Sequence, residues 1–462
     1  MSNPESDVLL NLAFRLFIAD LFLTASRLLE VITMAGGGRI PYLGVTIHVI
    51  TLMLAVVSGG ARRVATSKVG IYLGLFTCWM LTCTLTSTWR GGSVDVLLRQ
   101  WLPSLIIFLS CGSVVTLRQC RRVLTLLATG SALIAATSYF LGTLKQGRLA
   151  FESGTLGNAN DLASLLILGA PFLIVPVLSQ SGSWLGKAMA FGLGGMMVIV
   201  VVRSGSRSNL LALAAILLVL FWSRPLSGKI KLATLTIALV FVLIAATPRE
   251  LLSRYATIFG DSTVGDDVAN SALESSLARQ HLLQQSLKLT MDHPVFGLGP
   301  GIFAVGEADL AKEEGQKASW HVSHNSYTQV SSEMGIPGLL LYLLALWFTF
   351  RNVFWFRANS RRIDATGTVS AMGLAVLLSL IGLCVNLTFS SNAYLYYLPM
   401  LMGISVVFRK SLEREMDLHS PAVTVPQVRL PAQNMTVKIE LPHPAAAKST
   451  YKFLGRPRRS GA

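Results

Sequence analysis

Charged residues are scarce in this chain. Only 13% of its 462 residues are Asp, Glu, Lys or Arg, whereas 52% are hydrophobic, and the mean hydropathy is +0.58. A soluble domain carries about 25% charged residues, so the composition excludes an ordinary soluble protein. The alternation of polar and apolar residues that marks outer-membrane strands is also missing. We therefore predict an all-α polytopic membrane protein.

Cysteines are few as well. The chain has five, of which four lie in apolar segments and one, Cys120, lies in the basic stretch "RQCRR". They form no CxxC pair and show no metal-ligand spacing, so we interpret them as packing residues or free thiols. On this basis we expect no metal and no cofactor.

Long apolar runs, in contrast, recur along the whole chain. Because about 20 apolar residues span a bilayer, these runs predict about twelve transmembrane helices, at approximately 10–34, 41–60, 69–89, 100–117, 123–144, 160–180, 186–202, 208–222, 232–247, 335–356, 367–388 and 391–408. The first run must turn one face into the bundle or toward the interface, because it contains four charged residues: Arg15, Asp20, Arg27 and Glu30.

Basic residues outnumber acidic ones, 39 to 23, and give a formal net charge of +16. Such an excess could indicate a nucleic-acid partner, but Lys and Arg in cytoplasmic loops explain it in a membrane protein. With the predicted spans, all basic clusters fall on one side, which makes that side cytoplasmic and places both termini inside. The clusters are Arg62, Arg63 and Lys68; Arg118, Arg121 and Arg122; Arg224, Lys229 and Lys231; Arg351, Arg357, Arg361 and Arg362; and Arg409, Lys410 and Arg414. We expect no nucleic-acid partner.

One connection, 248–334, is long and falls on the outer side. It is polar but contains helix-like pieces such as "ESSLARQHLLQQSLKLT", so we predict a small, partly helical cap. Loops longer than about 12–15 residues are usually functional or disordered. The predicted membrane domain covers 1–409 with this loop inserted. Residues 410–462, with scattered prolines and a basic end, are predicted to be a disordered cytoplasmic tail.

Two outward segments carry arginines. In "RSGSRSN", Arg203 and Arg207 go against the positive-inside bias, so they either snorkel to outer headgroups or form a clamp for an anion such as phosphate. Arg279, in "LARQHLLQQSLKLTMDHPVFGLGPGIF", is either a surface helix residue or a second phosphate contact. His293 and Pro294 should end that helix, and the glycines that follow indicate a loop with unusual backbone angles rather than a nucleotide site.

The stretch "SWHVSHNSYTQVSSEMGIPG" stands where the outer loop meets an apolar run. His321 and His324 are three residues apart, which on a helix places them on one face, but a third metal ligand at matching spacing is missing. His324 is therefore either a structural hydrogen-bonding residue or, beside outward arginines, a base that takes a proton from a hydroxyl.

Together these segments resemble the O-antigen ligase-like membrane proteins, a family that includes O-antigen ligases and polysaccharide polymerases. The resemblance rests on "GTLGNANDLAS", "GSRSN", Arg279, "HPVFGLGPGIF" and, most specifically, "HNSYTQVSSEMGIPG". It covers roughly residues 150–400, whereas the preceding part of the chain resembles the family only in hydropathy.

The resemblance implies a GT-C-type glycosyltransferase of the bacterial inner membrane with a periplasmic active site. Its donor would be a glycan on undecaprenyl pyrophosphate, and its acceptor a sugar hydroxyl on lipid A–core or on another repeat unit. By position, His324 would activate the acceptor, while Arg207 and Arg279 would hold the pyrophosphate without a metal. Asn325 would orient the imidazole or the acceptor. Asn160 would bind sugar hydroxyls or, equally well, cap a helix, for which it is a better candidate than the asparagine two positions earlier.

An alternative of another class is a transporter or flippase of lipid-linked glycans. Only the charged first span favours it, since paired half-chains and interrupted helices are not clear in the sequence. Within the enzyme class, an O-antigen ligase, a polysaccharide polymerase and a protein-directed oligosaccharyltransferase stay undistinguished. In each case the expected partners are lipid-linked glycans and membrane lipids.

Overall fold

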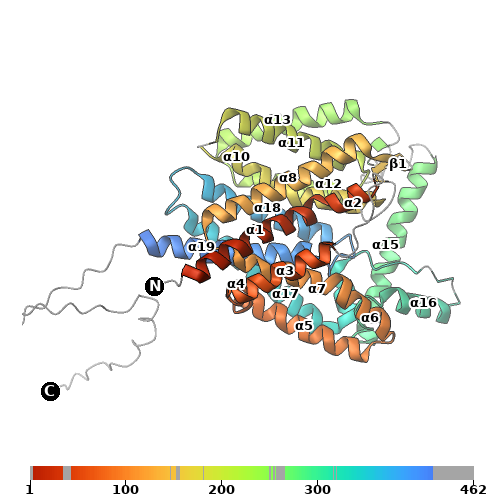
Figure 1. Ribbon diagram of the computed structural model, residues 1–462. Helices are drawn as coiled ribbons and strands as arrows, with labels where there is room; N and C mark the ends of the chain where they lie inside the picture. Colours follow the sequence, from red (N-terminus) through yellow and green to blue (C-terminus); the bar gives the residue numbers. More distant parts are fainter. Residues whose placement is uncertain are drawn as a thin grey trace, which may run out of the picture. The chain divides into compact units, whose positions relative to one another are not determined.

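The computed structural model describes residues 4–34, 43–145, 147–151, 157–180, 182–248, 251–252, 255, 266–315, 317–318 and 320–419. Most of them are helical, and the sheet within these ranges is a two-stranded hairpin in which β1 (Thr143–Lys145) pairs antiparallel with β2 (Arg148–Ala150). Figure 1 labels the helices along the chain. Nine of the described helices are long and apolar enough to cross a bilayer. The prediction of an all-α polytopic membrane protein is confirmed in this form.

These nine candidates overlap predicted spans, with ends shifted by as much as ten residues, since the span predicted from 100 begins at Arg90. Two of them are composite and include short π-helical or 3-10 turns. The candidates are α1 (Pro4–Ser26); α5 (Lys68–Thr86); α6 (Arg90–Val96) continued by η1 (Leu97–Trp101), α7 (Leu102–Ser110) and η2 (Cys111–Ser113); α8 (Leu117–Leu141); α9 (Ala159–Gly169) continued by η4 (Ala170–Leu173) and α10 (Ile174–Leu178); α11 (Trp184–Arg203); α13 (Leu226–Ala246); α17 (Ser326–Ser360); and α18 (Thr368–Leu387).

The remaining predicted spans fall on helices that do not meet the same criteria. α3 (Leu43–Val57) and α12 (Arg207–Trp222) are apolar but shorter, and the C-terminal part of α19 (Tyr397–His419) is charged. The first predicted span, 10–34, is interrupted at Arg27, whose φ of 47° separates α1 from α2 (Leu28–Met34). The total of twelve crossings therefore remains a prediction.

Two of the boundary differences change the predicted limits of the outer loop and of the membrane domain. α17 begins at Ser326 rather than near 335, because its polar first turns are buried and hydrogen-bonded instead of solvated. The predicted outer loop, 248–334, therefore ends earlier than expected. α19 runs to His419, past the predicted end of the membrane domain at 409, and the rest of the predicted tail, 420–462, lies outside the described residues.

A kink divides α17 at Gly335, whose φ of 69° and ψ of −177° are not helical. Glycine adopts this conformation readily because it has no Cβ. A Cβ at this position would collide with the carbonyl group of Val295, in the loop that follows α15 (Asp266–Asp292). The kink thus marks the place where that loop packs against α17.

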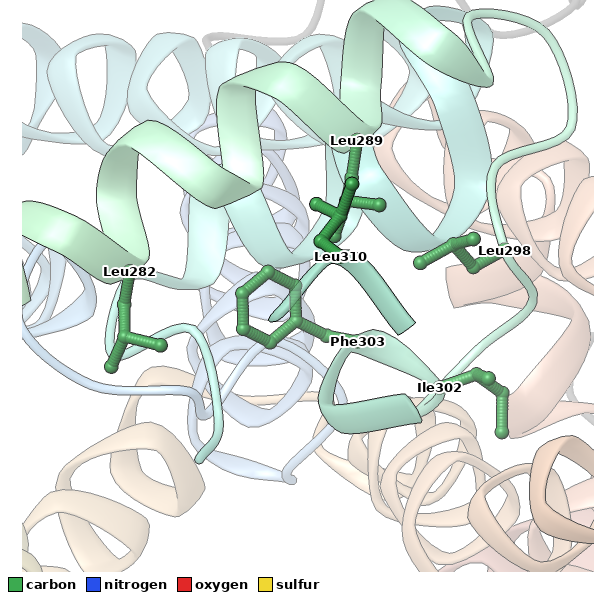
Figure 2. Packing of buried hydrophobic residues seen from close by; sticks show 6 residues of the cluster. All are labelled: Leu282, Leu289, Leu298, Ile302, Phe303 and Leu310. Carbon is green, nitrogen blue, oxygen red and sulfur yellow. The ribbon is translucent and has the colours of Figure 1, made fainter. Parts of the chain in front are cut away.

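The long connection between α13 and α17 contains the predicted helix. α15 ends directly before His293 and Pro294, as predicted, and α16 (Phe303–Glu313) follows after a short loop. Apolar side chains from α15, α16 and this loop form the small core drawn in Figure 2: Leu282, Leu289, Leu298, Ile302, Phe303 and Leu310. Each fully buried Leu, Ile or Phe contributes about 1.5–3 kcal/mol, which accounts for a folded cap in this part of the connection.

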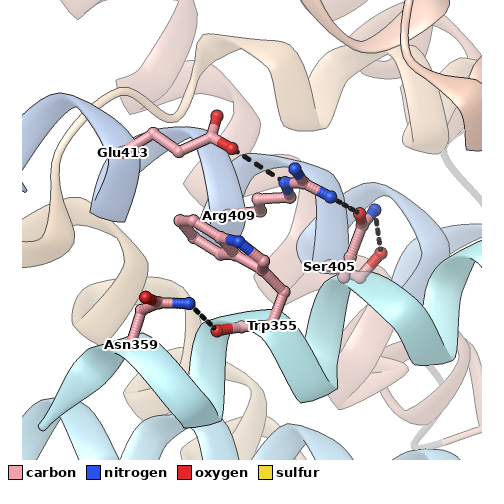
Figure 3. A network of polar contacts seen from close by, with 6 residues as sticks. Trp355, Asn359, Ser405, Arg409 and Glu413 are labelled. Atoms are coloured by element: carbon pink, nitrogen blue, oxygen red, sulfur yellow. Dashed lines mark hydrogen bonds and ion pairs between the residues drawn. The ribbon is translucent and has the colours of Figure 1, made fainter.

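At its other end α17 is tied to α19 (Figure 3). Arg409 of α19 donates hydrogen bonds to Glu413 Oε1 at 2.8 Å and to Asn352 Oδ1 at 3.4 Å. Its guanidinium also lies over the ring of Trp355, 4.8 Å from the centroid. The two helices are therefore fixed to each other far from Ser326.

Basic clusters that the predicted topology assigns to one side do meet in the structure. Lys410 Nζ donates to the backbone carbonyl of Arg63, in α4 (Gly60–Ala65), at 2.6 Å. Cys120 Sγ, near the start of α8, lies 3.5 Å from Ser411 Oγ. The start of α8, α4 and the charged part of α19 therefore share one end of the bundle. That this end is cytoplasmic remains a prediction.

Candidate functional site

The start of α17 is organised by Asn325. Its side-chain oxygen accepts hydrogen bonds from the backbone N–H groups of Tyr327, at 2.9 Å, and Thr328, at 3.2 Å. These are donors that a helix start otherwise leaves unpaired. Asn325 is thus the N-cap of α17, and its predicted role in orienting the imidazole or the acceptor is untested.

His324 precedes this cap in a left-handed backbone conformation, with a φ of 52°. Its backbone N–H donates to Ser391 Oγ at 2.8 Å, and Ser391 belongs to the connection between α18 and α19. Ser323 Oγ lies 3.3 Å from the same hydroxyl and donates to the carbonyl of Asn325 at 3.0 Å. These bonds hold a strained backbone in place and leave the imidazole half-buried at the entrance to the helix.

The charge state of His324 is set by its surroundings. Burial, followed by the electrostatic effects of Arg279 and His321, lowers the pKa of the imidazole to about 4. The ring is therefore neutral near pH 7 and has a lone pair that can accept a proton. Because Arg279 acts electrostatically on His324, α15 and the start of α17 contribute to one site.

His321 and His324 do not share a helix face. Residues 320–325 are not helical, and His321 is exposed whereas His324 is half-buried. The spacing argument for a shared face is wrong here because α17 begins only after Asn325.

The turn between α11 and α12 separates Arg203 from Arg207 and is held by a third arginine. Arg148 of β2 donates from Nε to the carbonyl of Ser204 at 2.8 Å, and from Nη2 to Asn160 Oδ1 at 2.8 Å. One guanidinium therefore connects the hairpin, the turn and the first turn of α9. Arg207, the first residue of α12, is half-buried on this fixed turn.

The guanidinium of Arg203 lies over the ring of Tyr139, in α8, at 5.7 Å from the centroid. A cation–π contact at a partly exposed site contributes about 0.5–1 kcal/mol. The contact holds the last residue of α11 against α8. Both sequence interpretations of Arg203, snorkelling and anion binding, stay open.

Asn160 is not the cap of α9. The N-cap is Asn158, whose Oδ1 accepts from the backbone N–H of Asn160 at 2.9 Å. The predicted preference for Asn160 is wrong because α9 begins at Ala159. The side chain of Asn160 instead accepts the hydrogen bond from Arg148, and its contact with sugar hydroxyls stays a prediction.

A series of buried polar side chains joins the start of α12 to the start of α17. Asn209 Nδ2 donates to the carbonyl of Asn160 at 3.1 Å, and Asn386 Nδ2 of α18 donates to Asn209 Oδ1 at 2.9 Å. Ser390 Oγ donates to the carbonyl of Asn386 at 3.0 Å, and Ser326 Oγ donates to the carbonyl of Ser390 at 2.6 Å. The arginine-bearing turn and the histidine at the entrance to α17 are therefore carried on the same end of the bundle.

The loop after α15 is held by Glu333, a carboxylate only 2% exposed and given no role by prediction. Its Oε2 accepts from the backbone N–H of Gly301 and from the hydroxyl of Tyr394, each at 2.7 Å. Its Oε1 accepts from the backbone N–H of Phe303 at 3.2 Å. One carboxylate thus joins α17, the cap and the connection between α18 and α19.

Some of these residues could have been found from sequence. Glu333 and Asn386 lie next to or inside apolar runs, where a polar side chain must find partners, and this is a usable signal. Arg148 lies in a short polar connection without any motif around it, so no local pattern indicates its contacts.

Comparison with known protein families bears directly on this region. Residues 192–343 match the family model described as O-antigen ligase. This stretch of the chain is similar to the O-antigen ligase family. The matched region of this O-antigen ligase-like protein contains five residues singled out from the sequence: Arg203, Arg207, Arg279, His324 and Asn325. Among curated proteins no match to the chain was found.

The predicted family resemblance is therefore confirmed, over a narrower stretch than the predicted 150–400. Asn160 and Arg148 lie outside the matched residues. The family implies a membrane glycosyltransferase of the O-antigen ligase or polymerase type, with lipid-linked glycans as substrates.

Proposed function

We propose that this O-antigen ligase-like protein transfers a glycan from undecaprenyl pyrophosphate to a sugar hydroxyl, at the end of the bundle that carries His324, Arg207 and Arg279. The observation that supports this most is the neutral, half-buried imidazole under the influence of Arg279. A general base needs an available lone pair, and a diphosphate leaving group needs fixed positive charge. The electrostatic effect of Arg279 on this imidazole supports both requirements at this place.

In the proposed reaction the acceptor hydroxyl oxygen attacks the anomeric carbon of the donor glycan. The bond between that carbon and the pyrophosphate oxygen breaks, and its electron pair leaves with undecaprenyl pyrophosphate. His324 takes the proton of the hydroxyl, while Arg207 and Arg279 stabilise the charge that develops on the diphosphate. Burial is the largest cause of the lowered pKa of His324, and the charge of Arg279 is the next. The bound diphosphate offsets the charge of Arg279, so it shifts the pKa of His324 upward, toward the range of an effective base.

We place this site on the periplasmic face of the inner membrane, with both termini in the cytoplasm. The basis is the positive-inside bias, because His324 precedes α17 whereas Arg357 and Arg361 lie at the opposite end of that helix. ATP is not at hand in the periplasm, so the energy for transfer has to come with the donor. A glycosyl pyrophosphate bond supplies it, and its polyprenyl chain can stay in the membrane.

The test uses purified protein in lipid nanodiscs with a labelled undecaprenyl-pyrophosphate glycan and either lipid A–core or free repeat oligosaccharide as the acceptor. His324→Ala should lower kcat by about 10²–10⁴-fold, the usual contribution of a general base, and Arg279→Ala should also lower it strongly. His293→Ala serves as the matched control, because it removes an exposed imidazole from the same outer segment. Unchanged kcat in His324→Ala would remove this residue from the mechanism.

Transport of lipid-linked glycans is the second candidate. The interruption of the first span at Arg27 and the kink of α17 at Gly335 favour it, since broken helices are common in transporters. Nanodiscs have no second compartment, so glycan transfer there supports the enzyme. Movement of labelled donor across liposome membranes without any transfer would support the transporter instead.

A further inference from the structure

An exposed tryptophan stands four residues before His324 and is not used by the proposed mechanism. Trp320 is 63% exposed, although a tryptophan ring offers a large apolar area for burial. Its φ of 54° is left-handed, a conformation that is unfavourable for a residue with a Cβ. Both the exposed ring and the left-handed backbone are unfavourable for Trp320. Because the fold tolerates both at one residue, we interpret the outward position of the ring as a built feature.

The backbone at Trp320 is fixed by a buried acid. Its N–H donates to Glu307 Oε2 at 3.0 Å, and Glu307, in α16, is only 2% exposed. A buried carboxylate is costly unless donors surround it, so this contact is a built feature of the cap.

The segment that begins at Trp320 is anchored at its far end as well, where the N–H of His324 donates to Ser391 Oγ. We call residues 320–324 the histidine strap. Within it Ser323 points inward and is 2% exposed, whereas Trp320 and Val322 face outward, at 63% and 50%. The ring of Trp320 is thus presented by a short segment held at both ends.

We infer that Trp320 is a stacking platform for a sugar ring of the acceptor glycan, an inference that rests on the proposed function. Sugar rings carry an apolar face of C–H groups that packs on an indole, while their hydroxyls remain available to water. Four residues span at most about 14 Å, so the platform lies within a few sugar units of the imidazole. Because His324 takes the proton of the acceptor and the arginines hold the donor diphosphate, an aromatic ring on the histidine strap belongs to the acceptor side.

The competing explanation is that Trp320 anchors the chain among lipid headgroups, where tryptophans are common. The two explanations differ in what they require of the side chain. Stacking needs a flat aromatic ring, so phenylalanine or tyrosine should replace tryptophan and leucine should not. Anchoring depends on apolar character, which leucine also has.

The experiment is a steady-state analysis of the full-length protein in nanodiscs, with labelled undecaprenyl-pyrophosphate glycan as the donor and lipid A–core or repeat oligosaccharide as the acceptor. Trp320→Ala and Trp320→Leu should each raise the acceptor KM by about five- to tenfold, the effect of one lost aromatic contact. Donor KM and kcat should stay unchanged, and Trp320→Phe should retain most of the acceptor affinity. Trp184→Ala is the matched control, because Trp184 is 80% exposed and begins α11 at the end opposite Arg203.

Three results would overturn the inference: an unchanged acceptor KM in Trp320→Ala, a lowered kcat without a change in acceptor KM, or full rescue by leucine. Folding of each variant is checked by gel filtration and thermal unfolding. If Trp320→Ala is unstable, the comparison of Trp320→Leu with Trp320→Phe decides the question instead. A wild-type protein that transfers no glycan would refute the proposed function itself, and the inference with it. Normal transfer with unchanged acceptor KM would refute the stacking platform alone.

Discussion

Replacing Glu333 by glutamine perturbs the contact that joins α17 to the cap. In the wild type the carboxylate accepts from the N–H groups of Gly301 and Phe303 and from the hydroxyl of Tyr394, and it is also hydrogen-bonded to the side chain of Gln329. In Glu333→Gln the amide oxygen can still accept from Gly301 and Tyr394. The amide NH₂ then faces the N–H of Phe303, so one hydrogen bond is lost and one buried donor remains unsatisfied.

The size of the effect follows from these contacts. Hydrogen bonds to a charged acceptor contribute about 1.5–3 kcal/mol, neutral ones about 0.5–1.5 kcal/mol, and an unsatisfied buried donor costs about 1–3 kcal/mol. Removing a buried charge offsets part of the loss. We expect Glu333→Gln to lower the free energy of unfolding by about 2–4 kcal/mol.

The measurement is denaturant unfolding of the purified protein in micelles, combined with limited proteolysis of the loop 293–303. Tyr394→Phe is the comparison, because it removes one donor and leaves the carboxylate with both backbone N–H groups. Its effect should be smaller, and the double variant should lose less than the sum of the two single variants, because the residues are in contact. A Glu333→Gln protein with wild-type stability and an equally protected loop would refute this account of the carboxylate.

Three further predictions concern titratable groups. The pKa of His324 in the folded protein, about 4, lies below the ordinary imidazole value of 6.5, so the unfolded chain takes up the proton first. Stability that is fully present above pH 6.5 should be lost as the pH falls through 4, and pH-dependent unfolding of His324→Gln should lack this part of the loss. Arg279→Gln removes a positive charge, so the pKa of His324 should rise and the acidic limb of kcat/KM should move to higher pH; an unmoved limb would contradict the electrostatic coupling. His48 Nδ1 lies 2.5 Å from Asp20 Oδ1 between α3 and α1; His48→Leu should cost about 1–3 kcal/mol by removing the polar neighbour of a buried side chain, and the double variant Asp20→Leu/His48→Leu should recover most of this stability in micelle unfolding.

The fold class could be predicted because membrane spans depend mainly on local hydropathy. Hydropathy fails where polar residues are buried against one another. The stretch "SYTQVSSE" reads as loop, yet Ser326, Ser332 and Glu333 are buried in the first turns of α17. Their partners lie far along the chain, in the loop after α15 and after α18, so no local window can reveal that the stretch is helical.

In the candidate site, too, local sequence signals reveal some residues, whereas contacts between distant residues remain hidden. The stretch around His324 is informative because its histidine, helix cap and following glycines are adjacent in sequence. Arg148, in contrast, contacts Ser204 and Asn160 through the fold alone. The error at Asn160 is local and smaller: the two asparagines are nearly equivalent as caps, and a start two residues earlier decides between them.

The position of His324 relative to the arginine-bearing turn therefore depends on where the helices begin and end. In a bilayer, lipid chains are as apolar as leucine, so apolar packing alone discriminates weakly between alternative helix neighbours. Buried amides and hydroxyls discriminate more strongly between helix neighbours, because each must find a hydrogen-bond partner at its own depth in the bilayer. Asn386 meets both Asn209 and Ser164, and the hydrogen bonds continue through Ser390 to Ser326. This polar series fixes the depth of α9, α12, α17 and α18 relative to one another, and so it sets which side chains can reach a substrate at this end of the bundle.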